Sequence, residues 1–127
     1  AGGVERATLN PQALAAIGRL TDHGAALVGR VIRAFLADTP VRLVHLREAG
    51  QTGNAEALRK AAHALKSSCA NVGAERLAAF AAELEAIARR GTVAGASALL
   101  ERADAEWPQV AALLQARVAS GAVDAVS

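Results

Sequence analysis

Apolar residues recur every three or four positions along most of the chain, the spacing that places them on one face of a helix. Short polar or glycine-containing stretches separate these periodic segments. The pattern predicts six helices, which run from Pro11 to near Gly18, from about Gly24 to Asp38, from Thr39-Pro40 to near Gly50, from Asn54 to Gly73, from about Leu77 to Arg90, and from about Thr92 to Val118.

Residues with special backbone preferences mark several helix ends. Asn10 and Thr39 each precede a proline, the usual order of an N-cap and a first helical residue. Asn54 is another capping residue, and Gly73 permits the left-handed conformation that commonly ends a helix. We therefore expect the second and third helices to meet at Thr39, almost without a gap.

The composition favours helices over strands. Hydrophobic residues make up 53% of the chain but aromatic residues only 2%, and the mixture is rich in alanine and leucine. A chain of 127 residues can bury one sizeable core. We expect an all-α fold, an antiparallel four-helix bundle with one or two short additional helices covering an end.

Periodicity is missing at both ends of the chain. We expect a flexible N-terminal linker over residues 1–8, a bundle domain over 9–118, and a frayed tail over 119–127. No run of about eighteen apolar residues and no charged-then-apolar leader is present, so the sequence predicts neither a membrane span nor a secretory signal. The expected location is the cytoplasm.

Several kinds of site find little support. The net charge of +2 comes with no basic block of the kind that follows a nucleic-acid backbone. No glycine-rich phosphate loop is present, and His23 and His45 do not share a metal-ligand spacing with His63. The single cysteine, Cys69, falls on the inward stripe of its helix and is expected to pack as a small apolar residue. We expect no bound metal or cofactor.

His63 is the candidate for chemistry. Its helix presents an apolar stripe of Ala62, Leu65, Cys69 and Val72, and His63 is rotated away from that stripe toward solvent. Its neighbours one turn away on the same side are three cations and one small residue, namely Arg59, Lys60, Lys66 and Ser67. A neutral imidazole is a competent nucleophile near pH 7, so this helix face could bring an anion to a nucleophile.

The run from Ala62 through His63, Lys66 and Ser67 to Gly73, followed by Leu84-Glu85, resembles histidine-containing phosphotransfer (HPt) domains of bacterial phosphorelays. The resemblance covers about Leu9 to Val118. In that family the matching histidine carries a phosphoryl group, which implies a carrier that accepts the group from the aspartate of one receiver domain and passes it to another. The family commonly has glycine where this chain has Ser67, and a small side chain meets the same steric need.

The resemblance also implies roles for the flanking residues and for the partners. Lys66 and Arg59 would offset the phosphoryl charge, with Lys60 at the rim. Ser67, Ala70 and Gly73 would leave room for a partner. Leu36, on the broad apolar face of the second helix, would add docking surface. The partners would be receiver domains that supply Mg²⁺ and the aspartate, so the chain needs no metal of its own.

Other interpretations remain open at this point. The bundle could be an interaction module that binds a receiver domain or another regulatory protein without phosphotransfer. Glu83 and Glu85 lie two positions apart with no paired nucleophile, and we expect both on a solvated face. No ATP-binding region is present, so kinase activity of the chain itself is not expected. We expect the domain to be a monomer. We also expect it to be a module of a hybrid sensor kinase. It would then lie in the cytoplasm, where the parent protein could itself be membrane-bound.

Overall fold

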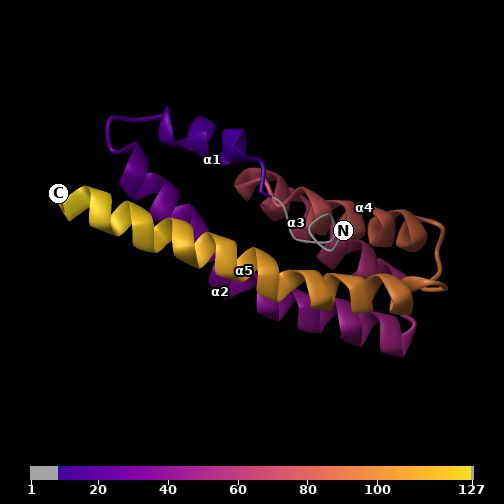
Figure 1. Ribbon diagram of the computed structural model, residues 1–127. Helices are drawn as coiled ribbons and strands as arrows, with labels where there is room; N and C mark the ends of the chain where they lie inside the picture. Colours follow the sequence, from indigo (N-terminus) through magenta and orange to yellow (C-terminus); the bar gives the residue numbers. More distant parts are fainter. Residues whose placement is uncertain (1–8, 127) are drawn as a thin grey trace.

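Five helices make up the computed structural model, which describes residues 9–126 and, for side chains, residues 9–120 (Figure 1). The helices are α1 (Pro11–Gly18), α2 (Gly24–Thr52), α3 (Ala55–Val72), α4 (Glu75–Arg89) and α5 (Ala96–Val126). Within the described residues no strand is present. The all-α class expected from the sequence is confirmed.

Four long helices form the bundle, and one short helix packs on it. Each of α2, α3, α4 and α5 contacts two of the others in the cyclic order α2, α3, α4, α5. The short α1 packs against α2 and α3 at one end, as Figure 1 shows. The four-helix bundle with one additional short helix is therefore the observed architecture.

The expected break at Thr39-Pro40 is wrong, because α2 continues through Pro40. Thr39 is fully buried within the bundle instead of capping a new helix. Proline inside a helix removes one backbone hydrogen bond and costs about 3 kcal/mol. Burial of the same helix face on both sides, by Phe35 before the proline and by Leu43 and Leu46 after it, offsets that cost and keeps one continuous helix.

The last helix also differs from its expected bounds. It begins at Ala96 and extends to Val126, where the sequence predicted about Thr92 to Val118. The Thr92 hydroxyl accepts a hydrogen bond from the Ala94 amide, which belongs to a turn that ends at Gly95 with a φ of 87°. The expected linker over residues 1–8 lies outside the described residues, and the division into linker, domain and tail stays a prediction.

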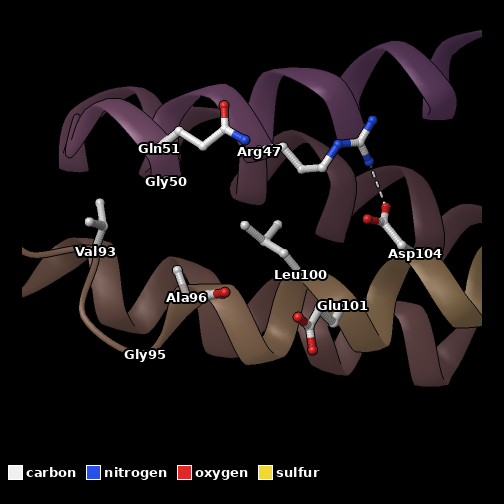
Figure 2. A pocket seen from close by; sticks show the side chains of 10 residues that line it. Arg47, Gly50, Gln51, Val93, Gly95, Ala96, Leu100, Glu101 and Asp104 are labelled. Atoms are coloured by element: carbon white, nitrogen blue, oxygen red, sulfur yellow. Dashed lines mark hydrogen bonds and ion pairs between the residues drawn. The ribbon is translucent and has the colours of Figure 1, made fainter.

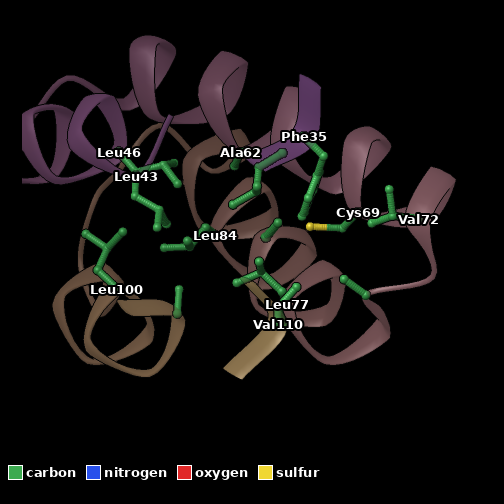
Figure 3. Close-up of a cluster of buried hydrophobic side chains, with 14 of the residues drawn as sticks. Phe35, Leu43, Leu46, Ala62, Cys69, Val72, Leu77, Leu84, Leu100 and Val110 are labelled. Carbon is green, nitrogen blue, oxygen red and sulfur yellow. The ribbon is translucent and has the colours of Figure 1, made fainter. Parts of the chain in front are cut away.

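The core draws on all five helices, with Leu14 as the buried residue of α1. Figure 3 shows core side chains of the four long helices meeting between them. The largest fully buried side chains are aliphatic, and they are Ile32, Leu46, Leu58, Leu65, Leu77, Leu84 and Leu114. Phe35 and Trp107 join α2 to α5 by an edge-to-face contact with ring centroids 5.6 Å apart. Cys69 is buried as expected, and burial raises the pKa of its thiol to about 12, so it is an inert core residue.

Two capping residues set the ends of α3, as predicted. The side chain of Asn54 accepts a hydrogen bond from the Ala57 amide at 3.0 Å, and Gly73 has a φ of 78°. The carbonyl of Gly73 also accepts a hydrogen bond from the Asn10 amide at 2.8 Å, which ties the start of α1 to the end of α3. No helix in the described part of the chain is long and apolar enough to span a membrane.

Candidate functional site

His63 lies near the middle of α3 on the side away from the core. The buried stripe of this helix consists of Leu58, Ala62, Leu65, Cys69 and Val72. The side chain of His63 itself is 56% exposed. The outward direction expected from the helical spacing is confirmed, and the ring is open to a partner on its solvent side.

Glu85, on α4, contacts the His63 ring at Nδ1. Its carboxylate oxygen Oε2 lies 2.8 Å from Nδ1 of His63, and Oε1 accepts a hydrogen bond from Nζ of Lys66 at 2.5 Å. A third donor, the guanidinium of Arg89, reaches Oε2 at 3.2 Å. The Glu85 side chain is only 4% exposed, so three cationic or hydrogen-bonding groups surround a buried carboxylate.

This environment determines the charge of Glu85. The pKa of the carboxyl group is lowered to about 2, chiefly by the hydrogen bond from Lys66. Burial alone would raise this pKa, but the hydrogen bonds from His63 and Arg89 lower it further. Glu85 is therefore ionised at neutral pH and can only accept hydrogen bonds. Nδ1 of His63 must carry the shared hydrogen, and in the neutral ring this leaves the lone pair on Nε2.

The expectation that Glu85 lies on a solvated face is wrong, whereas Glu83 is exposed as expected. Both positions are polar, but Glu85 follows Leu84 and comes four residues after Ala81, both of them fully buried. Position 85 is thus at the edge of the buried stripe of α4. The helical spacing of Glu85 from Ala81 and Leu84 was therefore enough to predict from the sequence that Glu85 lies beside the core.

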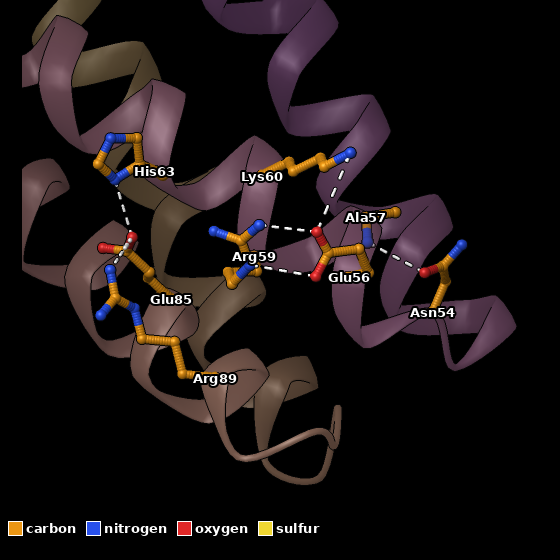
Figure 4. A network of polar contacts seen from close by, with 8 residues as sticks. All are labelled: Asn54, Glu56, Ala57, Arg59, Lys60, His63, Glu85 and Arg89. Carbon is orange, nitrogen blue, oxygen red and sulfur yellow. Dashed lines mark hydrogen bonds and ion pairs between the residues drawn. The ribbon is translucent and has the colours of Figure 1, made fainter.

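The cations beside His63 are not arranged as expected. Arg59 donates from Nε and from a terminal nitrogen to the two carboxylate oxygens of Glu56, at 3.2 Å and 2.7 Å, as Figure 4 shows. Nζ of Lys60 lies 4.0 Å from the same carboxylate. Each predicted cation is therefore paired with an acidic residue, Arg59 and Lys60 with Glu56 and Lys66 with Glu85. The sequence interpretation missed both acidic partners.

The small residues expected to leave room for a partner fall into two groups. Ser67 and Ala70 are exposed on the same side of α3 as His63. Gly73 is buried instead, and a Cβ there would come within 2.4 Å of the Asn10 carbonyl oxygen. The expected docking role does not fit that burial, because Gly73 serves to close the turn against α1. Leu36 is half-buried and packs against the core.

Other polar features lie apart from His63. His23 and His45 are exposed on other segments, and no group of three potential metal ligands is found among the described residues. A surface pocket between α2 and the start of α5 has an ion pair at its edge, where Arg47 and Asp104 are 2.7 Å apart (Figure 2). None of the residues predicted for the site lines this pocket. The chemistry around His63 therefore depends on α3 and α4.

Comparison with known proteins agrees with this geometry. The Hpt domain family matches residues 30–119. The crystal structure of histidine-containing phosphotransfer protein B (HptB) from Pseudomonas aeruginosa PAO1 matches with a TM-score of 0.80 and 33% sequence identity, over 88% of this chain and 95% of that chain. No curated protein sequence matches. The matched region spans most of the chain and contains His63, and the chain belongs to the Hpt domain family as a histidine phosphotransfer relay intermediate.

Proposed function

We propose that His63 is the residue that carries the phosphoryl group, and that Nε2 is the atom that receives it. The observation that supports this most is the pairing of a half-exposed ring with an ionised, buried carboxylate at Nδ1. The buried side of the ring is occupied by Glu85, so the free nitrogen is the one that a partner can reach. No comparable arrangement surrounds His23 or His45 within the described residues.

The transfer step needs no proton to leave the ring. The lone pair of Nε2 attacks the phosphorus of an aspartyl phosphate, the bond between phosphorus and the aspartyl oxygen breaks, and its electron pair stays on the partner's carboxylate. The ring then bears a phosphoryl group on Nε2, a hydrogen on Nδ1 and a positive charge. Glu85 accepts the Nδ1 hydrogen bond throughout and stabilises that charge. The reverse sequence returns the phosphoryl group to a second aspartate.

Charge around His63 suits this reaction. Four cationic side chains lie on α3 and α4 in this region, namely Arg59, Lys60, Lys66 and Arg89, and their carboxylate partners are Glu56 and Glu85. Two positive charges are thus in excess, and a phosphoryl group adds about two negative charges at pH 7. Lys66 and Arg89 both donate hydrogen bonds to the Glu85 carboxylate. They therefore act mainly by holding Glu85 in place beside the His63 ring.

Hpt domains interact with receiver domains, and we propose that a receiver domain docks over the exposed side of α3. Ser67 and Ala70 add little bulk beside the ring, so another active site can approach closely. Leu36 on α2 adds apolar contact at the margin. Mg²⁺ and the acceptor aspartate belong to the receiver, and this chain contributes the nucleophile and the surrounding charge.

We propose that the chain acts as a monomer in the cytoplasm. The apolar core is closed among the helices of one chain. The large apolar side chains that stay exposed among the described residues are few, and they are Leu20, Val41, Val44 and Leu113. Sedimentation equilibrium over a range of protein concentrations would test the monomer.

The experiment that tests the proposal is transfer of a radiolabelled phosphoryl group from a phosphorylated receiver domain with Mg²⁺. The chain is compared with His63→Gln and with His45→Gln, a matched control that removes another exposed helical histidine. We expect acid-labile, alkali-stable label on the unmodified chain and on the His45 variant, and none on the His63 variant. Label on His63→Gln at the normal level would overturn the assignment. Binding of several receivers without any label would favour an interaction module.

A further inference from the structure

Glu56 occupies the first turn of α3 and holds two cations that precede His63. Its two carboxylate oxygens accept hydrogen bonds from Arg59 at 2.7 Å and 3.2 Å, and Nζ of Lys60 lies 4.0 Å away. Figure 4 shows these contacts on one side of Arg59, while His63 contacts Glu85 instead. In this form of the protein the Arg59 guanidinium is thus directed to Glu56 and makes its hydrogen bonds there.

Arg59 nevertheless belongs to the surroundings of His63. The two residues are four positions apart on one helix, so they lie one turn apart on the same face. The hydrogen bond to Glu56 is the largest cause that raises the pKa of Arg59, and the charge of Glu85 also raises it. The effect of Glu85 is the smallest of these causes, and it agrees with the helical spacing in placing Arg59 near the carboxylate that contacts the His63 ring.

The pair of Glu56 and Arg59 is suited to exchange. The Glu56 side chain is 63% exposed and that of Arg59 is 35% exposed, and ion pairs in such settings contribute little to stability. A phosphoryl group offers more negative charge than a carboxylate, and the planar guanidinium matches its oxygens with two parallel hydrogen bonds. A phosphoryl group one turn away would therefore compete effectively with Glu56 for Arg59.

We propose that Glu56 is a positioning residue that keeps Arg59 away from unphosphorylated His63, and that Arg59 moves from the Glu56 carboxylate to the phosphoryl oxygens once His63 is phosphorylated. This inference rests on the proposed role of His63. The exchange replaces two hydrogen bonds to a carboxylate with hydrogen bonds to phosphoryl oxygens, and no covalent bond changes. Glu56 thereby limits how strongly the carrier holds its phosphoryl group, which favours onward transfer.

The test uses phosphoramidate as a small phosphoryl donor, so no receiver domain is needed. The phosphorylated chain is titrated by phosphorus NMR, which measures the proton affinity of the phosphoryl group. Glu56→Gln frees Arg59, so we expect this proton affinity to fall about twofold to fivefold, the range of a single exposed ion pair. Arg59→Ala should raise it by a similar factor. Glu75→Gln is the matched control, because Glu75 is the acidic residue in the first turn of α4.

The double variant separates the exchange from a simple effect of charge. When Arg59 is already alanine, Glu56→Gln should change the proton affinity by much less than it does in the unmodified chain. An undiminished change in that background, or an equal change from Glu75→Gln, would overturn the exchange while leaving the role of His63 intact. A chain that neither phosphoramidate nor a phosphorylated receiver labels on His63 would overturn both the exchange and the proposed function.

Discussion

Nδ1 of His63 lies 2.8 Å from Oε2 of Glu85, a contact between the middle of α3 and the second half of α4. It joins an exposed ring to a carboxylate that is almost completely buried. The buried partner fixes both the orientation of the ring and the nitrogen that bears the hydrogen. For the proposed phosphoryl transfer, the His63 ring is thus already oriented before any partner arrives.

Replacing this carboxylate should slow phosphoryl transfer without preventing folding. Glu85→Gln keeps the size of the side chain but loses the charge that stabilises the phosphorylated ring. A charge-assisted hydrogen bond contributes about 1.5–3 kcal/mol, so we expect a rate at least about tenfold lower in single-turnover transfer. Nitrogen NMR of Glu85→Ala should also show a mixture of ring tautomers in place of the Nδ1–H form. An unchanged rate and an unchanged tautomer would show that Glu85 does not position the ring.

The same residue should make stability depend on acid. The folded-state pKa of Glu85 is lowered from 4.5 to about 2, chiefly by the hydrogen bond from Lys66, so its stabilising effect is complete above about pH 4.5. That contribution is lost as the pH falls toward 2. Urea unfolding of the chain and of Glu85→Gln across this range should show a shallower acid loss in the variant. Parallel curves would contradict the assignment.

Glu106 should have the opposite effect on stability. Its side chain is 4% exposed, its Oε2 is buried without a hydrogen-bond partner, and burial raises the pKa of its carboxyl group despite the nearby charge of Arg76. Stability is therefore lost as the pH rises above about 4.5 and the group ionises. We expect Glu106→Gln to raise the free energy of unfolding at pH 7 by about 1 kcal/mol. The gain should disappear in acid, and exposed Glu101→Gln, as a control, should show no gain.

Two glycines with similar backbone angles allow strain to be separated from steric clash. Gly53 has a φ of 71° with no atom within 4 Å of an added Cβ, whereas at Gly73, with a φ of 78°, that Cβ would lie 2.4 Å from the Asn10 carbonyl oxygen. Gly53→Ala should cost about 1–2 kcal/mol through left-handed strain alone. Gly73→Ala should cost about 1–3 kcal/mol more, because α1 must move. Equal thermal shifts for the two variants would refute the clash.

Bulk beside His63 should obstruct the partner and leave the fold intact. Ser67 is exposed, so Ser67→Leu should change the free energy of unfolding by less than about 0.5 kcal/mol. Receiver binding should nevertheless weaken at least about tenfold, a loss of about 1.4 kcal/mol. Ala112→Leu adds the same side chain to an exposed position of α5 and serves as the control. Normal transfer by Ser67→Leu would contradict close approach over α3.

The sequence by itself determined most of the helices and the exposed position of His63. The stripe from Leu58 to Val72, the cap at Asn54 and the turn at Gly73 are local features, because a helix repeats its faces every 3.6 residues. Spacing within α3 therefore sufficed to direct His63 away from the core.

Tertiary structure decided what lies around that histidine. The packing of α3 on α4 brings Glu85 to the ring, although 22 positions separate the two residues, and burial of both halves of α2 carries that helix through Pro40. Contacts of this kind depend on the register between helices, which the local pattern of one segment does not contain. The proposed phosphoryl acceptor, His63, could be found from its own helix, but Glu85, which contacts its ring, became evident only when α3 and α4 were placed together.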